Sequence, residues 1–261
     1  MRRRAFTLVE VTVTVAIVAA LTAVLLPGLS AVSGMSRRTK CQSNLRQMGV
    51  AAAAYAASSN ESMPPAVLYF AEGGGVRTVA WDFEQRNGEV RPGPLWSWTG
   101  APSEVQQCPD YMGPSTFGAD PFTGYNYNTT FIGHEGTYPE VDPEGQVVDG
   151  WRTARMGRPL AAFASHDRTA LFGEGGWKGG ANKFMRAPLN SVEGSLPLVT
   201  AGAQAFRHVG ACTCFVCLDG HVATCDRPRR GAQTTDALAG AVLDFPSNGF
   251  LSEDDSAYDG R

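Results

Sequence analysis

Cysteine is the residue type in this chain best suited to chemistry, and four of the six cysteines lie close together in the sequence. Thiols pair as disulfides in an oxidising compartment, or bind a metal ion as thiolates. Structural zinc sites usually show paired Cys-x-x-Cys knuckles or pairs of histidines, whereas residues 212–217 hold one irregular group near His208 and His221. The pattern favours disulfides or buried thiols over zinc. The six cysteines are Cys41, Cys108, Cys212, Cys214, Cys217 and Cys225.

An Asp-Gly pair at 219–220 stands between two apolar runs of this Cys-rich segment. Such a pair is a strong hairpin signal, because a type I′ turn requires positive φ at both central residues. A two-residue loop would place Cys214 directly opposite Cys225, with Cα atoms about 5.5 Å apart, which is within disulfide range. Cys41 and Cys108 are then the leftover pair, and the sequence leaves their connectivity open.

Other side chains could carry acid–base or binding chemistry, but no complete motif accompanies them. His208 and Asp219 are explained by strand-end and turn geometry, so we expect no enzyme activity. The acidic stretch at 252–259 could bind calcium, although a solvated terminus is the simpler interpretation. We predict no cofactor and no metal, with calcium and zinc left as open alternatives. Five tryptophans could form either a sugar-binding platform or an ordinary core: Trp81, Trp96, Trp98, Trp151 and Trp177.

A carboxylate also lies near the start of the most apolar segment of the chain. Glu10 follows three arginines at 2–4 and precedes a run from Val11 to Val32 that holds no charged residue. About 20 apolar residues span the hydrocarbon core as a helix. The arginines should stay on the cytoplasmic side, which puts the rest of the chain outside. Since a carboxylate in lipid costs at least a few kcal/mol, we expect Glu10 to have a function and a cationic partner.

Residues 5–10 read Ala-Phe-Thr-Leu-Val-Glu and resemble the N-terminal signal of type IV prepilins. In that family a membrane peptidase removes a short basic leader before the phenylalanine and methylates the new amine. The resemblance implies cleavage between Ala5 and Phe6, and an ion pair between the Phe6 amine and Glu10 of a neighbouring subunit. Ala5 replaces the usual glycine, and we still expect cleavage because alanine is also small.

The hydrophobic pattern predicts the elements that position these groups. Leu45, Met48, Ala52 and Tyr55 recur at steps of three and four, so the helix should continue as an amphipathic one, after a bend or loosening near Pro27. Beyond it, turn residues recur at short intervals and predict short strands. The fold class is therefore α+β, with a long N-terminal helix packed on an antiparallel sheet that carries long loops. The predicted strands are 66–70, 76–83, 125–132, 169–173, 205–208, 213–218 and 221–225.

The predicted organisation has four parts. They are a leader at 1–5, a transmembrane or filament-core half of the helix at 6–32, an amphipathic half at 33–60, and a globular β-rich domain at 61–261. The body resembles the prepilin-associated family named for a histidine, nine residues and Asp-Gly, and here ten residues separate His208 from Asp219. The extra residue predicts a bulge in the Cys-rich strand, or else indicates a chain outside that family that shares its hairpin. A Cys-x-x-Asn-Leu-x-Gln-x-Gly pattern beginning at Cys41 is also similar to that of pilin-like proteins.

These observations predict a structural subunit and not an enzyme. The net charge of −3 gives no electrostatic footprint for nucleic acid. The resemblance implies a pilin-like fold and a pseudopilin of a type II secretion system or related type IV filament. Its expected partners are the prepilin peptidase and other pseudopilin subunits. Its expected location is the bacterial inner membrane, with one span and the body on the extracytoplasmic side. The alternative is a monomeric membrane-anchored extracytoplasmic protein that binds a glycan or a metal.

Overall fold

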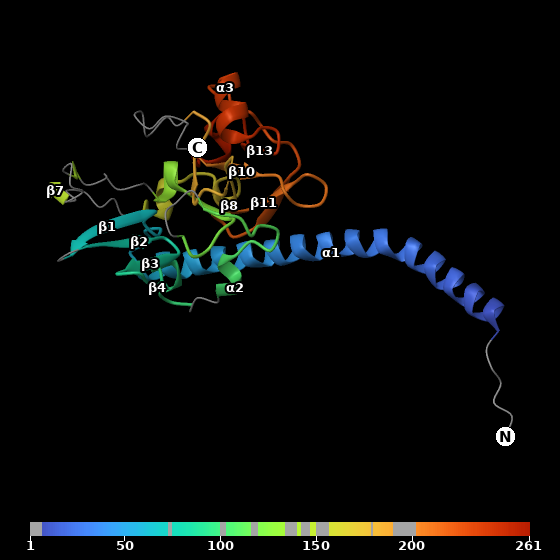
Figure 1. The fold of residues 1–261 in the computed structure, drawn as a ribbon. Helices are drawn as coiled ribbons and strands as arrows, with labels where there is room; N and C mark the ends of the chain where they lie inside the picture. The colour runs from blue at the N-terminus through green and yellow to red at the C-terminus, as the bar shows by residue number, and fades with distance from the viewer. Residues whose placement is uncertain are drawn as a thin grey trace.

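The computed structural model describes residues 7–72, 75–99, 103–115, 120–133, 140–141, 147–149, 157–178, 180–189 and 202–261. It combines one long N-terminal helix with antiparallel sheets, which confirms the α+β class (Figure 1). The predicted cleavage site at Ala5 and Phe6 lies outside the described residues, as does Trp151.

Helix α1 spans Leu8–Ser58 and confirms the predicted helix over the described part of that segment. Thr7 caps it in an extended conformation, and its 51 residues correspond to about 76 Å of helix. The helix continues through Pro27, and its N-terminal part is inclined to the axis of the remainder, in line with the predicted bend (Figure 1). It ends where Asn60 and Glu61 adopt positive φ angles of 53° and 59°.

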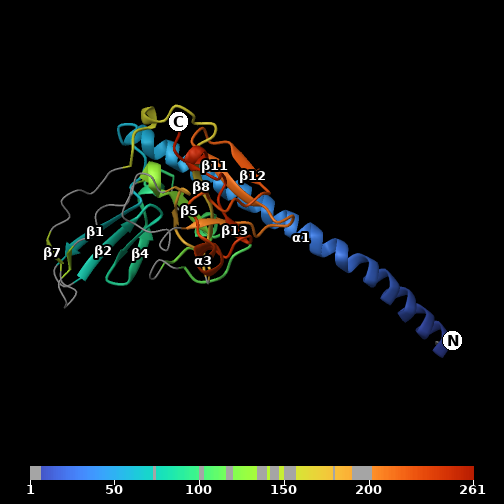
Figure 2. The ribbon, with the colours of Figure 1, turned by 90° about the horizontal axis from the view of Figure 1, so that it is seen from above.

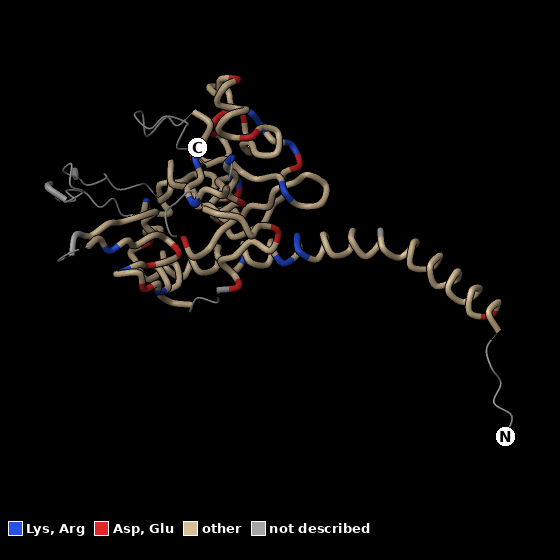
Figure 3. The backbone as a smooth tube through the Cα atoms, viewed as in Figure 1, with Lys and Arg blue, Asp and Glu red and all other residues tan. Residues whose placement is uncertain are grey.

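The two halves of α1 lie in different surroundings. Large apolar side chains of residues 8–32 are all exposed, from Leu8 at 82% to Val11 at 49%. In the second half, the face that carries Leu45, Met48 and Ala52 is fully buried against the body. Figure 2 shows the first half extending away from every other element. Figure 3 shows it without charge between its acidic N-terminal end and the basic residues where it meets the body.

The sheet that packs on α1 is built around strand β8, Ala170–Gly176. Strand β8 pairs antiparallel with β5, β10 and β11, and β11 and β8 contact the second half of α1. Strands β5 and β9 pair in parallel, so the sheet is mixed, whereas the sequence predicted an antiparallel sheet. The other strands are β5 Tyr125–Asn128, β9 Phe184–Met185, β10 Ala203–Ala205, β11 Thr213–Cys217, β12 Val222–Cys225 and β13 Asn248–Gly249.

A second antiparallel sheet, which the sequence did not predict as separate, follows α1 directly. It is a meander of β1 Val67–Glu72, β2 Gly75–Ala80, β3 Phe83–Arg86 and β4 Glu89–Pro92. The strand predicted over 76–83 is confirmed only as far as Ala80, because the chain turns at Trp81 and Asp82 before β3 begins. The strand predicted over 125–132 stops at Asn128, where residues 129–133 form a π-helical turn. Strands β6 Glu140–Val141 and β7 Val147–Asp149 form a separate pair.

The remaining elements are short. They are helices α2 Ser103–Gln106 and α3 Asp236–Leu238, the 3-10 turns Pro94–Trp96, Leu160–Ala162 and Asp255–Ala257, and a π-helical turn at Ala239–Leu243.

The two larger sheets are joined by aromatic packing and by a buried ionic group. Trp81 lies 5.1 Å from the ring of Phe172 and 5.9 Å from that of Tyr127, measured between centroids. Lys183, beside β9, contacts the carboxylate of Asp82 and lies 3.0 Å from that of Asp120. These three charged side chains are at most 2% exposed. Apolar burial and a buried charge cluster therefore both hold the sheets together.

The hairpin of β11 and β12 differs by one residue from its predicted register. The Cys217 amide donates to the His221 carbonyl (3.0 Å), so the loop has three residues, with Gly220 at φ +87°. Cys214 consequently lies opposite Thr224, and Cys225 lies opposite Thr213. The predicted pairing of Cys214 with Cys225 is wrong, because alternating side chains put the two sulfurs on opposite faces of the hairpin.

The predicted bulge is displaced to the neighbouring strand. The pairing of β11 with β8 shifts between Val216 and Cys217, where Val216 lies opposite Phe172 and Cys217 opposite Ala170. The extra residue is therefore Leu171 of β8 and does not belong to the Cys-rich strand.

The acidic C-terminal segment is only partly solvated, because Glu253 and Asp254 are exposed whereas Asp255 is buried against the body. Asp255 and Tyr258 are 6% and 0% exposed, and the Asp255 carboxylate accepts the Leu189 amide at 2.9 Å. Asp254 accepts the amide of Ser256 at 3.1 Å, and Glu253 accepts that of Gly231 at 3.2 Å. These carboxylates satisfy separate backbone amides and do not converge as calcium ligands would.

Candidate functional site

Four buried residues from distant segments bring metal-binding atoms together where α1 meets the main sheet. They are Cys41 on α1, Cys108 just after α2, Glu174 on β8, and His208 beyond β10. Their ligand atoms all lie within 4.8 Å of one another, and the residues are at most 2% exposed. We call this group the Cys-His-Glu cluster.

The local sequence explains how each element presents its side chain to the cluster. Cys41 precedes Leu45 and Met48 on the buried face of α1. Glu174 alternates with Gly173 and Gly175 on β8, so its side chain points toward α1 while the glycines lie on the other face. A Cβ at Gly175 would approach the Asn182 carbonyl oxygen to 2.3 Å, which shows how closely the chain packs there.

The Glu174 carboxylate occupies the centre of the cluster. Its Oε1 atom accepts from Cys41 Sγ at 2.9 Å and from Cys108 Sγ at 3.7 Å, and it contacts Nε2 of His208. Its Oε2 atom accepts from the Cys214 amide at 2.9 Å and from the Thr213 hydroxyl at 3.3 Å. One carboxylate oxygen is thus fixed by strand β11, and the other faces the thiols and the imidazole.

His208 is held by a carboxylate on its other ring nitrogen. Its Nδ1 lies 2.5 Å from Oδ2 of Asp110, whose Oδ1 contacts the Arg37 guanidinium of α1. The Nε2 atom is buried and, among the described residues, makes no hydrogen bond of normal geometry despite its contact with Glu174. Asp110 therefore orients the imidazole so that Nε2 points into the cluster.

Neighbouring side chains shift the pKa values of the imidazole and of the thiols. Burial lowers the pKa of His208, but the adjoining Cys214 thiol and Glu174 carboxylate outweigh burial and raise it to about 11. A hydrogen bond from Cys41 lowers the pKa of the Cys214 thiol to about 6, against the opposing effect of burial. The same kind of bond from Cys41 lowers the pKa of Cys108, whereas burial raises that of Cys41. The Cys214 thiol can therefore carry negative charge near neutral pH.

Of the remaining cysteines, Cys214 adjoins the cluster, with its thiol beside Cys41 and His208, and all six cysteines are free thiols in the structure. Cys212 donates to the Val209 carbonyl at 3.5 Å, and the partly exposed Cys225 donates to that of Arg227 at 3.5 Å. Burial, with help from Asp219, raises the pKa of Cys217 to about 12. The two cysteines that the sequence analysis left over as a pair, Cys41 and Cys108, are brought together as neighbours of Glu174 and His208.

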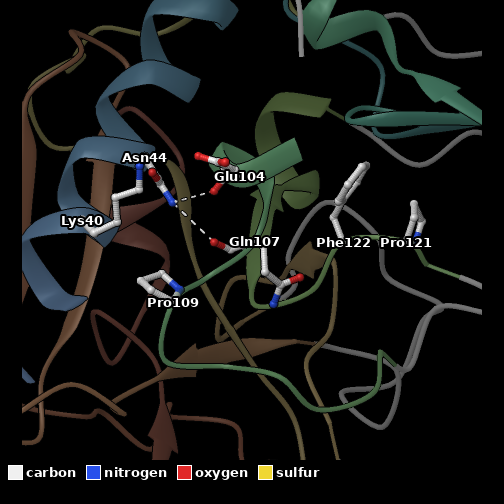
Figure 4. A pocket seen from close by; sticks show the side chains of 7 residues that line it. All are labelled: Lys40, Asn44, Glu104, Gln107, Pro109, Pro121 and Phe122. Atoms are coloured by element: carbon white, nitrogen blue, oxygen red, sulfur yellow. Dashed lines mark hydrogen bonds between the residues drawn. The ribbon is translucent and has the colours of Figure 1, made fainter. Parts of the chain in front are cut away.

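A shallow hollow of about 510 Å³ lies on the surface between α1 and α2 (Figure 4). Asn44 closes its inner side by donating to the carbonyls of Glu104 and Gln107 at 3.3 and 3.4 Å, and to the Tyr125 hydroxyl at 3.2 Å. These bonds attach α1 to the α2 segment, one turn along from Cys41. The hollow is lined by Lys40, Asn44, Glu104, Gln107, Pro109, Pro121 and Phe122.

Glu10 has a partner within its own helix that the sequence analysis missed. Its Oε2 atom accepts the Thr7 amide at 2.8 Å and the Thr7 hydroxyl at 2.8 Å, while the Glu10 amide donates to that hydroxyl at 3.3 Å. This reciprocal arrangement is a capping box, which the Thr-x-x-Glu spacing of the sequence predicts. The isolated chain therefore satisfies this carboxylate without a cation.

The other predicted candidates separate in the structure. Asp219 accepts the His221 amide at 3.0 Å and contacts the His221 ring, while His208 pairs with Asp110, so His208 and Asp219 form no dyad. Trp81 and Trp96 are buried core residues, whereas Trp98 is 63% exposed. Among the described residues, these tryptophans form no common surface platform.

The N-terminal helix is long and apolar enough to cross a membrane. The apolar 18-residue stretch of the helix on which this statement rests is 0% buried within the structure.

Comparisons with models of protein families, with curated proteins and with solved structures find no significant match to this chain.

Sequence reasoning overlooked two members of the site, Glu174 and Asp110. Glu174 has a recognisable signal, since it is the one charged residue in an otherwise buried Ala-Leu-Phe-Gly-Glu-Gly-Gly strand. A charge in such a strand is expensive unless it is paired. Asp110 follows Cys108-Pro109 in a loop, and the sequence offers no comparable signal for it.

Proposed function

We propose that this chain is a pilin-like structural subunit, a pseudopilin of a type II secretion system or related type IV filament. In this proposal the prepilin peptidase removes residues 1–5, and residues 6–32 hold the chain in the inner membrane before assembly. The body lies on the extracytoplasmic side because the arginines at 2–4 favour the cytoplasm. The chain is a substrate of the peptidase and has no enzymatic role of its own.

The observation that carries the proposal is the contrast between the two halves of α1. The first half exposes a continuous apolar surface that extends from Leu8, 82% exposed, beyond Leu29, 64% exposed. Such a surface is unstable in water and requires lipid or other apolar helices around it. The second half is fixed to the body by buried side chains. A subunit of this shape can exchange lipid contacts for contacts with identical helices.

The position of Glu10 supports assembly over simple anchoring. Its carboxylate lies in the first turn of an otherwise uncharged apolar helix, where it caps the helix through its Oε2 atom. A capping box explains how an isolated chain tolerates the charge in the membrane interface. The resemblance of residues 5–10 to prepilins adds a second partner, because a free Phe6 amine of a neighbouring subunit would supply a cation.

The mature N-terminus is the first test. We expect mass spectrometry of the chain purified from its native membrane to find N-methylated Phe6 at the N-terminus. An intact Met1 on the mature protein would refute processing, and with it the pseudopilin assignment.

Substitution of Glu10 tests assembly separately. We expect Glu10→Ala to insert and be cleaved normally but to be lost from filaments, because the amine of the neighbouring subunit has no counter-ion. Glu89→Ala is the matched control, since Glu89 is an exposed glutamate of strand β4 that forms an ion pair with the exposed Arg91. Filament content measured by shearing and immunoblotting should fall for Glu10→Ala alone. Equal filament content of both variants and wild type would contradict the role of Glu10.

A further inference from the structure

We propose that the Cys-His-Glu cluster binds one Zn²⁺ ion, with Cys41, Cys108, Glu174 and His208 as its ligands. The ion would tie helix α1 to the α2 segment, to β8 and to the chain beyond β10. This inference stands apart from filament assembly, because it concerns how the body is attached to its own helix.

The number and the chemistry of the donors fit zinc. Two thiolates, an imidazole nitrogen and a carboxylate oxygen are ligand types that Zn²⁺ accepts in a tetrahedral shell. At Zn–S distances of about 2.3 Å, tetrahedral ligands lie about 3.8 Å apart. The four ligand atoms already lie within 4.8 Å of one another, so only small side-chain movements are needed. Soft thiolate ligands disfavour Mg²⁺ and Ca²⁺, which select oxygen.

The site has the outer hydrogen bonds that metal ligands commonly show. The Nδ1 atom of His208 pairs with the Asp110 carboxylate, so that Nε2 is the nitrogen that can bind the ion. Arg37 forms an ion pair with the same carboxylate. Glu174 is anchored through Oε2 by the Cys214 amide at 2.9 Å, which leaves Oε1 for the ion. The Tyr125 hydroxyl donates to Cys41 Sγ at 3.4 Å.

The cluster is poorly satisfied by its own side chains. The Nε2 atom of His208 is buried without a hydrogen bond of normal geometry among the described residues. The Oε1 atom of Glu174, whose side chain is 0% exposed, contacts His208 Nε2 and otherwise accepts only from the Cys41 and Cys108 thiols among the described residues, and thiols are weak donors. A divalent cation at their meeting point would neutralise the carboxylate and pair the nitrogen. Binding releases the thiol protons of Cys41 and Cys108, and the Nε2 proton of His208, to solvent.

A disulfide between Cys41 and Cys108 is the competing use of these sulfurs. It would employ two of the four side chains and leave His208 and Glu174 buried side by side without a role. It also would not require Asp110 to orient the imidazole. The observations therefore favour the ion, and the disulfide becomes an outcome of the test.

The test uses the full chain, solubilised in detergent and purified without chelators or metal-affinity resin. We expect elemental analysis by mass spectrometry to find about one zinc per chain. After zinc removal, added Co²⁺ should give the near-ultraviolet absorption of thiolate-to-cobalt charge transfer. Wild-type chain that holds no zinc and gives no such absorption would overturn the proposal. So would a metal-free chain in which peptide mapping finds a Cys41–Cys108 disulfide.

Variants separate the cluster from the other thiols. Cys41→Ser and Cys108→Ser should lose stoichiometric zinc, whereas Cys225→Ser, which removes a partly exposed thiol on the other face of the hairpin, should keep it. Asp110→Asn retains every ligand and should weaken zinc binding by about 10–100-fold in competition with a chromophoric chelator. Circular dichroism checks that each variant is folded. Equal zinc loss in Cys225→Ser and Cys41→Ser, or wild-type affinity in Asp110→Asn, would contradict the assignment.

Discussion

Lys183 offers the sharpest test of how the body is held together. Its ammonium group contacts Asp82, lies 3.0 Å from Asp120, and lies 4.9 Å and 5.3 Å from the ring centroids of Trp81 and Phe83. Lys183→Met fills the same volume but leaves two carboxylates that are 1% and 2% exposed without their cation. Removing one partner from a buried ionic group costs about 3–5 kcal/mol.

That loss should be visible as a large shift in thermal unfolding. A change of about 4 kcal/mol in a domain of this size lowers Tm by about 8–16 °C. Tryptophan fluorescence is a suitable signal, since Trp81 lies beside the substituted side chain. Lys178→Met is the matched control, because Lys178 is exposed and five residues away, and it should change stability by no more than about 0.5 kcal/mol.

The pH dependence gives the prediction a second, independent readout. In the wild-type chain, burial raises the pKa of Asp82 from 3.8 to about 6 although Lys183 opposes the rise. A carboxyl whose pKa is higher in the folded state binds protons more tightly there, so its contribution to stability is lost as pH rises from about 4 to 6. Without the ammonium the pKa should rise further. The deficit of Lys183→Met should therefore be larger at pH 8 than at pH 5. A deficit equal at both pH values, or no larger than that of Lys178→Met, would refute the reasoning.

Two further substitutions test the packing of α1 and of β8, both by thermal unfolding. Leu45→Ala should lower the free energy of unfolding by about 2–5 kcal/mol, because Leu45 is 0% exposed against the body. Val50→Ala, at a position that is 60% exposed, should have little effect. Similar losses for the two variants would contradict the docking of this face of α1. Gly175→Ala should lower the free energy of unfolding by about 1–3 kcal/mol, because the new Cβ would lie 2.3 Å from the Asn182 carbonyl oxygen. Gly240→Ala should be tolerated, because a Cβ there would have no atom within 4 Å among the described residues. An unchanged Tm for Gly175→Ala would show that β8 has room to move.

The hairpin of β11 and β12 shows why one part of the site could be predicted only approximately. Asp219-Gly220 placed the turn correctly, because a residue with positive φ is a local requirement that glycine meets. The Asp-Gly pair does not determine the length of the loop, since two-residue and three-residue loops both accept it. The loop in the structure has three residues, and this difference of one residue makes Thr224, and not Cys225, the cross-strand partner of Cys214. Because the side-chain period of a strand is two, an error of one residue reverses the face of every side chain.

The sequence by itself determined the long helix, its apolar and amphipathic halves, and the position of the Cys-rich hairpin. These features depend on hydrophobic period, helix propensity and turn chemistry, which act over a few residues along the chain. The tertiary structure alone decided that Cys41, Cys108, Glu174 and His208 meet, because the four lie in segments that are distant along the chain. Their approach depends on how α1 crosses β8 and β11, and that crossing follows from side-chain packing across the whole core.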